Sequence, residues 1–147
     1  MYVDRIFRQV WLPLGAALIF AISASGSYSS IAAAADIKVT LAGDQEVPPV
    51  KGAGTGTGTI VVGADKSVGG SVTTTGIAGT AAHIHEGATG KNGPVIIPLT
   101  KNGDAYAVPA GAKLTDAQFA SFQAGNLYVN VHTAANPGGE IRGQLKP

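Results

Sequence analysis

Apolar and polar residues alternate with a period of two over most of the chain after residue 36, which predicts β-strands with one buried face. The predicted strands cover residues 37–41, 54–62, 68–75, 81–86, 95–99, 106–108, 127–132 and 140–145. Turn signals separate these strands at short intervals. The pattern favours an all-β fold, an antiparallel Greek-key sandwich or flattened barrel of the superoxide dismutase-like or immunoglobulin-like type.

Two segments near the start of this pattern have linker-like compositions. Residues 54–58 alternate glycine with threonine, but β-branched residues at every second position fit a strand whose glycine face lies close against bulky side chains. Pro48 and Pro49 cannot donate hydrogen bonds to a sheet, so residues 43–50 are predicted to form a packed loop or a sheet edge.

One short helix is predicted. Thr115 and Gln118 have the spacing of a capping box, and Leu114 and Phe119 that of a hydrophobic staple. Gly125 is placed to end the helix. We expect this helix to cover one end of the core.

Residues 1–35 predict a secretory signal peptide. Arg5 and Arg8 give a positive start, the apolar stretch 10–22 is too short to span a bilayer, and the small residues at 31–35 offer a cleavage site. An uncleaved membrane anchor is the alternative, which a proline, a glycine and a serine cluster in this region oppose. The prediction is therefore a periplasmic or secreted protein, with no membrane span after the signal is removed.

The remaining residues, 36–147, are enough for a single domain with its own core. They contain eight basic and eight acidic residues, which gives no reason to expect nucleic acid or anionic lipid as a partner. The chain has no cysteine, and its only methionine is Met1. Any metal site in the domain must therefore use nitrogen and oxygen ligands.

The three histidines fall in two of the predicted strands. His83 and His85 are two residues apart, so a strand points both imidazoles to one face. His132 lies with Tyr128 and Asn130 on the polar face of the strand 127–132. If the two strands are neighbours, all three imidazoles meet on the face of the sheet that points away from the core. Three neutral imidazoles suit copper, which has the higher affinity, or zinc.

Other side chains near the histidines are candidates for completing or orienting such a site. The side chains expected to surround and orient the ligands are Tyr128, Asn130, Glu140 and Arg142. Glu86 is the poorest candidate ligand, because alternation places it on the face of Ile84. Alternatives without metal are exposed histidines or a structural hydrogen-bond network, with Tyr128 covering a hydrophobic edge and Arg142 with Glu140 forming a cross-strand or loop-anchoring pair.

Two common chemistries have little support. The glycine-rich loop 87–94 leads into a strand and not a helix, so it does not have the form of a phosphate cradle. No Ser-His-Asp order or paired-carboxylate spacing stands out, which argues against hydrolysis. No catalytic residue is predicted, and the chain is not expected to be an enzyme.

Five ordered motifs together resemble the chordin-type domain, usually called CHRD, over residues 41–145. They are Glu46-Val47-Pro48-Pro49, Ala82-His83-Ile84-His85, Asn92-Gly93-Pro94-Val95, the segment 127–133 and the segment 137–145. In animals such domains occur in chordin, a secreted antagonist of growth factors. In bacteria they are mostly stand-alone secreted proteins. The resemblance therefore implies fold and location more than function.

A more distant similarity links the histidines to copper/zinc superoxide dismutases. His83, His85 and His132 match three copper ligands of that family in order, and Arg142 lies roughly where the family keeps an arginine that guides superoxide. The bridging fourth histidine, the zinc-binding loop and the disulfide of that family are missing. The similarity implies a three-histidine copper site and not a complete dismutase site.

The sequence thus predicts a secreted or periplasmic domain that binds one copper ion and handles metal without turnover. One alternative is an interaction module without metal, in which the loop 87–94 and the Pro48-Pro49 segment contact a protein partner or the cell envelope. The other is a superoxide dismutase-like copper enzyme with Arg142 as the guide.

Overall fold

The computed structural model describes residues 34–147. The predicted signal peptide lies outside the described residues except for its last two, so it stays a prediction. No helix among residues 34–147 has the length and apolar character that crossing a membrane requires.

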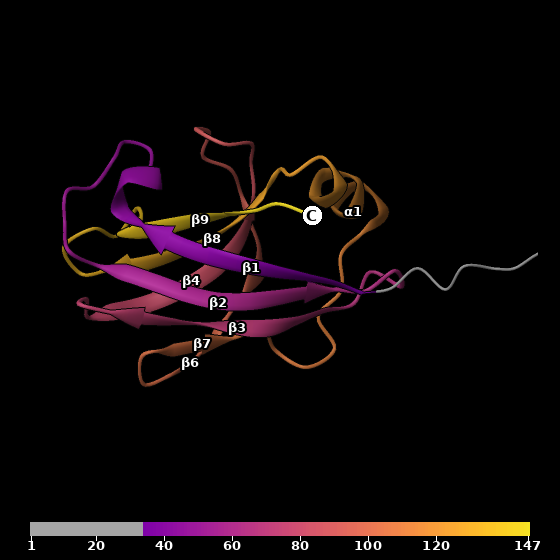
Figure 1. The fold of residues 1–147 in the computed structure, drawn as a ribbon, viewed down its shortest axis with the longest axis horizontal. Coiled ribbons are helices and arrows are strands. Elements are labelled where there is room, and N and C mark those ends of the chain that lie inside the picture. Colours follow the sequence, from indigo (N-terminus) through magenta and orange to yellow (C-terminus); the bar gives the residue numbers. More distant parts are fainter. Residues whose placement is uncertain (1–33) are drawn as a thin grey trace, which may run out of the picture. The chain divides into compact units, whose positions relative to one another are not determined.

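The described residues form one antiparallel sheet that curls into a nearly closed barrel (Figure 1). Its nine strands are β1 (Ala35–Ala42), β2 (Thr55–Val62), β3 (Val68–Thr75), β4 (Gly79–Glu86), β5 (Val95–Pro98), β6 (Thr100–Asn102), β7 (Ala105–Ala107), β8 (Leu127–Thr133) and β9 (Ile141–Leu145). Their order across the sheet is β5-β4-β8-β9-β1-β2-β3-β7-β6. A 3-10 turn spans Gly43–Gln45, and the one α-helix of this part of the chain is α1 (Asp116–Gln123). The predicted all-β barrel-like class with one short helix is confirmed.

The predicted strand 95–99 does not continue into the hairpin that follows it. Residues 95–99 were expected to lead directly into a hairpin, but β5 ends at Pro98 and β6 begins at Thr100. Proline has no N–H to donate, and the N–H of Leu99 donates to the Ala82 carbonyl at 2.9 Å. The chain crosses here from one edge of the sheet to the other, which brings the two edges together without closing the barrel.

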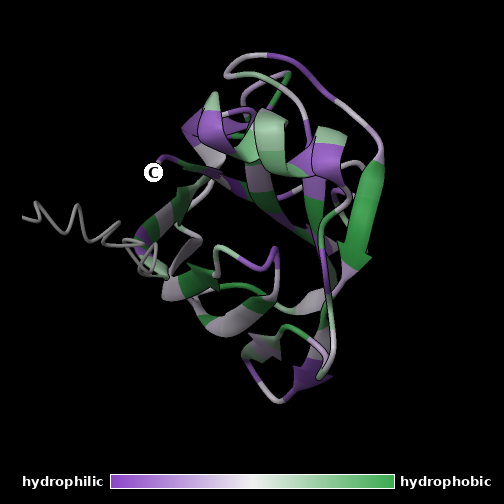
Figure 2. Cartoon of the chain, turned by 90° about the vertical axis from the view of Figure 1, so that its right-hand side faces the viewer, coloured by the Kyte–Doolittle hydropathy of each residue, from purple (hydrophilic) through white to green (hydrophobic). Residues whose placement is uncertain are grey.

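The core fills the inside of the curled sheet, and it comes from the alternating positions that the sequence pattern predicted. Figure 2 shows hydrophobic and hydrophilic residues following one another along the strands. The most deeply buried apolar side chains include Leu41, Ile60, Val72, Ile84, Val129, Val131, Ile141 and Leu145.

The glycines before and within β2 lie where larger residues would not fit. A Cβ at Gly54 would come within 2.3 Å of the Ile77 side chain, and one at Gly56 within 3.2 Å of Ile141. The prediction of a strand whose glycines face bulky side chains is confirmed.

Helix α1 begins as the sequence indicated. The N–H of Gln118 donates to Thr115 Oγ1 at 3.2 Å, and the N–H of Thr115 donates to Gln118 Oε1 at 2.9 Å, which completes the capping box. Gly125 follows the helix with a φ of +72°. Phe122 is buried in the core, so the helix packs onto the barrel as expected.

The face of β4, β8 and β9 that points away from the core was expected to be exterior, and this expectation is wrong. Tyr128 is 1% exposed and Asn130 2% exposed. The loop 43–50 and the loop 87–94 account for this burial, and they contact each other through a 2.8 Å hydrogen bond from Asn92 Nδ2 to the Val47 carbonyl. The predicted histidine site therefore lies beside these loops, with His85 buried and His83 and His132 partly exposed.

Candidate metal centre

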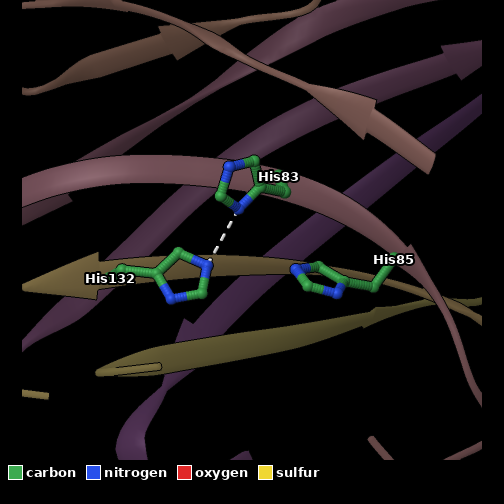
Figure 3. A group of neighbouring side chains, drawn as sticks. All are labelled: His83, His85 and His132. Carbon is green, nitrogen blue, oxygen red and sulfur yellow. Dashed lines mark hydrogen bonds between the residues drawn. The ribbon is translucent and has the colours of Figure 1, made fainter. Parts of the chain in front are cut away.

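The structure brings the three histidines together. Strands β4 and β8 are neighbours, with Ala81 opposite His132 and His83 opposite Asn130. Because side chains alternate along a strand, His83, His85 and His132 project from the same face. One ring nitrogen from each lies within 4.8 Å of the others, and Figure 3 shows the three rings gathered around one space.

Backbone carbonyls determine which nitrogens of two rings are available. His85 Nδ1 lies 3.0 Å from the Gly93 carbonyl oxygen, and His132 Nδ1 lies 2.9 Å from that of Pro137. A carbonyl oxygen only accepts, so both Nδ1 atoms carry the hydrogen and, in the neutral rings, both Nε2 atoms keep a lone pair. Histidines that bind metals usually have this arrangement, with the second nitrogen donating to a fixed acceptor.

The third ring, that of His83, lies against the lone pair of His132 Nε2. His83 Nδ1 lies 2.9 Å from His132 Nε2, at the dashed line in Figure 3. Since neutral His132 offers a lone pair there, His83 Nδ1 donates when no metal is bound. A metal at this position would require the hydrogen of His83 to move to its Nε2.

His85 presents a polar atom that has no partner. Its side chain is 8% exposed, and Nε2 is among the few buried side-chain nitrogen and oxygen atoms of residues 34–147 without a hydrogen bond. Such atoms are uncommon in folded proteins because the lost interaction with water is not replaced. A metal ion bound by this nitrogen would take the place of the lost interaction with water.

The surroundings favour neutral imidazoles. Burial lowers the pKa of His83 below its usual value, and the neighbouring His132 and His85 lower it further. Burial also lowers the pKa of His85, assisted by His132 and Arg142 and opposed by the hydrogen bond to Gly93. Neutral rings are the form that binds metal.

Tyr128 and Arg142 extend the site in a stack. The Tyr128 ring lies parallel to the His85 ring, with centroids 4.8 Å apart, and its hydroxyl accepts a 3.1 Å hydrogen bond from the Gly93 N–H. The Arg142 guanidinium carbon lies 3.5 Å from the centroid of the Tyr128 ring. Tyr128 therefore contacts a candidate ligand directly, and its role in orienting that ligand stays a prediction.

Arg142 anchors the loop above the site. Its guanidinium donates to the carbonyls of Lys91 and Ala88 at 2.9 and 3.0 Å and to Gln144 Oε1 at 3.0 Å. The side chain is 1% exposed, so burial lowers its pKa below the usual value. Arg142 thus anchors a loop as predicted, but its partners are carbonyls of the loop 87–94 and not the expected Glu140.

The expected pairing of Arg142 with Glu140 is absent. The salt bridges among residues 34–147 join Lys66 to Asp116 and Lys113 to Asp65. Glu140 instead accepts hydrogen bonds from Thr133 Oγ1 at 2.7 Å and Asn136 Nδ2 at 2.6 Å. It holds the turn between β8 and β9, which contains the Pro137 carbonyl that binds His132, and it does not join the histidine group.

Asn130 connects the site to a residue that the sequence reasoning missed. Asn130 Nδ2 donates to Glu46 Oε2 at 3.1 Å, and Glu46 is 5% exposed. Burial raises the pKa of Glu46 to about 7, although Arg142 and the Asn130 hydrogen bond oppose the shift. The available signal was the position of Glu46 in a loop predicted to be packed.

Glu86 points away from the histidines, as alternation predicted. Its carboxylate accepts a hydrogen bond from Ser121 Oγ at 2.5 Å, on helix α1. It thus ties β4 to the helix and is not part of the histidine group.

Fold and site together define an antiparallel β-barrel-like domain with a partly buried cluster of three histidines. The family model of the CHRD domain matches residues 37–145, so the chain belongs to the CHRD domain family. No curated protein and no solved structure gives a significant match to the chain. CHRD domains are typically extracellular interaction modules, which is consistent with the predicted export.

Proposed function

We propose that this protein binds one copper ion through His83, His85 and His132 in the periplasm or outside the cell, and that it handles metal without turnover. The observation that carries the proposal is the buried Nε2 atom of His85, which has no hydrogen-bond partner among residues 34–147. It belongs to a group of three ring nitrogens within 4.8 Å of one another.

The ligand atoms follow from the hydrogen bonds. Nε2 of His85 and Nε2 of His132 are the nitrogens that backbone carbonyls leave free, and Nδ1 of His83 is the nitrogen nearest to His132. Copper is favoured over zinc because it stands higher in the affinity order for a given set of nitrogen ligands. Once bound, the metal would join β4 to β8 beside the loop 87–94.

Metal handling is favoured over turnover by the surroundings of the cluster. The one arginine beside it, Arg142, is committed to three acceptors and is 1% exposed. A dismutase-like guide requires a cation that substrate can approach. The superoxide dismutase-like alternative therefore gains no support from this residue.

Isothermal titration with copper(I) under nitrogen and, separately, with copper(II) tests the proposal, which requires that at least one of the two ions binds. We expect one equivalent to bind, and His85→Ala to bind at least about tenfold more weakly, because loss of one of three ligands removes more than the 1.4 kcal/mol of a tenfold change. Glu86→Gln is the matched control, since the neighbouring carboxylate faces helix α1 and should leave binding unchanged. Equal, weak binding of both copper(I) and copper(II) by the wild type and His85→Ala would contradict the proposal.

The interaction-module alternative is favoured by a separate observation. The loop 87–94 and the Pro48-Pro49 segment were predicted as a contact surface, and residues of both loops border a cavity of about 410 Å³ lined by Gln45, Val47, Pro49 and Gly90, among others. A pull-down that depends on these loops and is unaffected by a metal chelator would support this function over copper binding.

A further inference from the structure

The proposed metal centre has no negative charge among its ligands. The group contains three imidazoles, and no Asp or Glu of the described residues joins it. Glu46, the buried carboxyl on this face, hydrogen-bonds to Asn130 and stays outside the group. A bound ion would therefore keep its whole charge in a partly buried place, with His85 buried and His83 and His132 partly exposed.

The fixed charge beside the centre is positive. The ring planes of His85 and Tyr128 are 11° apart, and the Arg142 guanidinium lies 3.5 Å from the centroid of Tyr128. One face of the phenol ring has no room for both groups, so Tyr128 lies between the imidazole and the guanidinium. The hydrogen bonds of Arg142 go to neutral carbonyl and amide oxygens, and none goes to a carboxylate.

From this charge arrangement, and on the basis of the proposed function, we infer that the centre selects a monovalent ion, copper(I), over copper(II) and zinc(II). The cost of burying an ion without a counter-charge grows with the square of its charge, so a dication costs about four times as much as a monocation. A nearby guanidinium also repels a dication twice as strongly. Neutral nitrogen ligands suit both oxidation states of copper. The charge of the ion therefore determines which oxidation state binds more tightly.

Competition against chelators tests the inference on the whole protein. Copper(I) is titrated against bicinchoninate under nitrogen, and copper(II) and zinc(II) are titrated against nitrilotriacetate. We expect the protein to keep copper(I) and to lose both divalent ions to the chelator. Copper(II) or zinc(II) held as tightly as copper(I) would overturn the inference and leave the proposed function intact. Failure to bind any of the three ions would overturn both.

Ala81 offers a matched pair of variants. It lies opposite His132 in the register of β4 and β8, and it shares the face of His83. Ala81→Glu places a carboxylate beside the cluster, and Ala81→Gln places a neutral side chain of the same size there. Zinc(II) and silver(I) are used because neither ion changes its oxidation state. We expect the ratio of zinc(II) affinity to silver(I) affinity to be at least about tenfold higher in Ala81→Glu than in Ala81→Gln. Equal ratios in the two variants would contradict the dependence on charge.

Discussion

The Tyr128 hydroxyl accepts a hydrogen bond from the N–H of Gly93, and the carbonyl oxygen of the same glycine accepts one from His85 Nδ1. Because the Tyr128 ring also stacks on the His85 imidazole, these three residues form a closed set of contacts. The orientation of the candidate ligand His85 is therefore coupled to the position of the loop 87–94.

Tyr128→Phe should distinguish the contribution of the Tyr128 hydroxyl from that of its stacked ring. The variant keeps an aromatic ring against His85 but leaves the Gly93 N–H without its acceptor, which we expect to lower the free energy of unfolding by about 1–3 kcal/mol. Copper affinity should fall by about ten- to a hundredfold, the usual effect of removing a group that orients a ligand. Urea denaturation and copper titration measure the two effects.

Tyr106→Phe is the control for that experiment. Tyr106 is also fully buried, but its hydroxyl has no hydrogen-bond partner in the part of the chain that the structure describes. Removing an unpartnered hydroxyl should leave stability unchanged or raised, and copper binding unchanged. If both variants lose the same stability, the hydrogen bond from Gly93 to Tyr128 does not have the role assigned here.

Gly93→Ala should disturb the loop that positions His85. A Cβ at residue 93 would lie 1.6 Å from the Glu86 carbonyl oxygen, so the loop must move away from β4. We expect a loss of copper affinity of at least about tenfold, since the acceptor for His85 Nδ1 moves with the loop. Copper titration of this variant and of Gly138→Ala measures the effect.

Gly138→Ala is the matched control because a Cβ there meets nothing within 4 Å. Residue 138 follows Pro137, whose carbonyl accepts from His132 Nδ1, so it tests a second loop at the site. The free energy of unfolding of Gly138→Ala should differ from that of the wild type by less than about 0.5 kcal/mol. Unchanged copper affinity in Gly93→Ala would show that the loop 87–94 does not position His85.

Alternation along two strands was enough to predict where the histidines project. The period of two placed His83 and His85 on one face, and the same rule put His132 on the corresponding face of the second strand. That the strands are neighbours followed from no local signal, because strand pairing is set by the whole sheet. The meeting of the three rings was therefore a hypothesis until the topology was known.

The covering of that face was not predictable from the same pattern. It depends on contacts between residues far apart in sequence, such as Arg142 with the carbonyls of Ala88 and Lys91. A polar alternation pattern looks the same whether loops or water lie above it. For this reason Asn130 was assigned to open surface, and its partner Glu46 was missed.

The buried carboxyl of Glu46 should make stability depend on pH. Burial raises its pKa from 4.5 to about 7 in the folded protein, so folding favours the protonated form. The stability that this proton contributes is fully present below pH 4.5 and is lost as the pH rises through 7. Over that interval we expect the wild type to lose at most about 3 kcal/mol relative to Glu46→Gln, which cannot ionise.

Urea denaturation of wild type and Glu46→Gln from pH 4.5 to 8, without metal, measures this difference. His83 and His85 shift stability in the opposite direction, because their lowered pKa values make the folded protein lose stability below pH 6.5. Both proteins contain the same histidines, so that contribution cancels in the difference. The advantage of Glu46→Gln should grow steadily with pH. A difference that stays constant from pH 4.5 to 8 would mean that Glu46 has an ordinary pKa in the folded protein and is not held in a buried pair with Asn130.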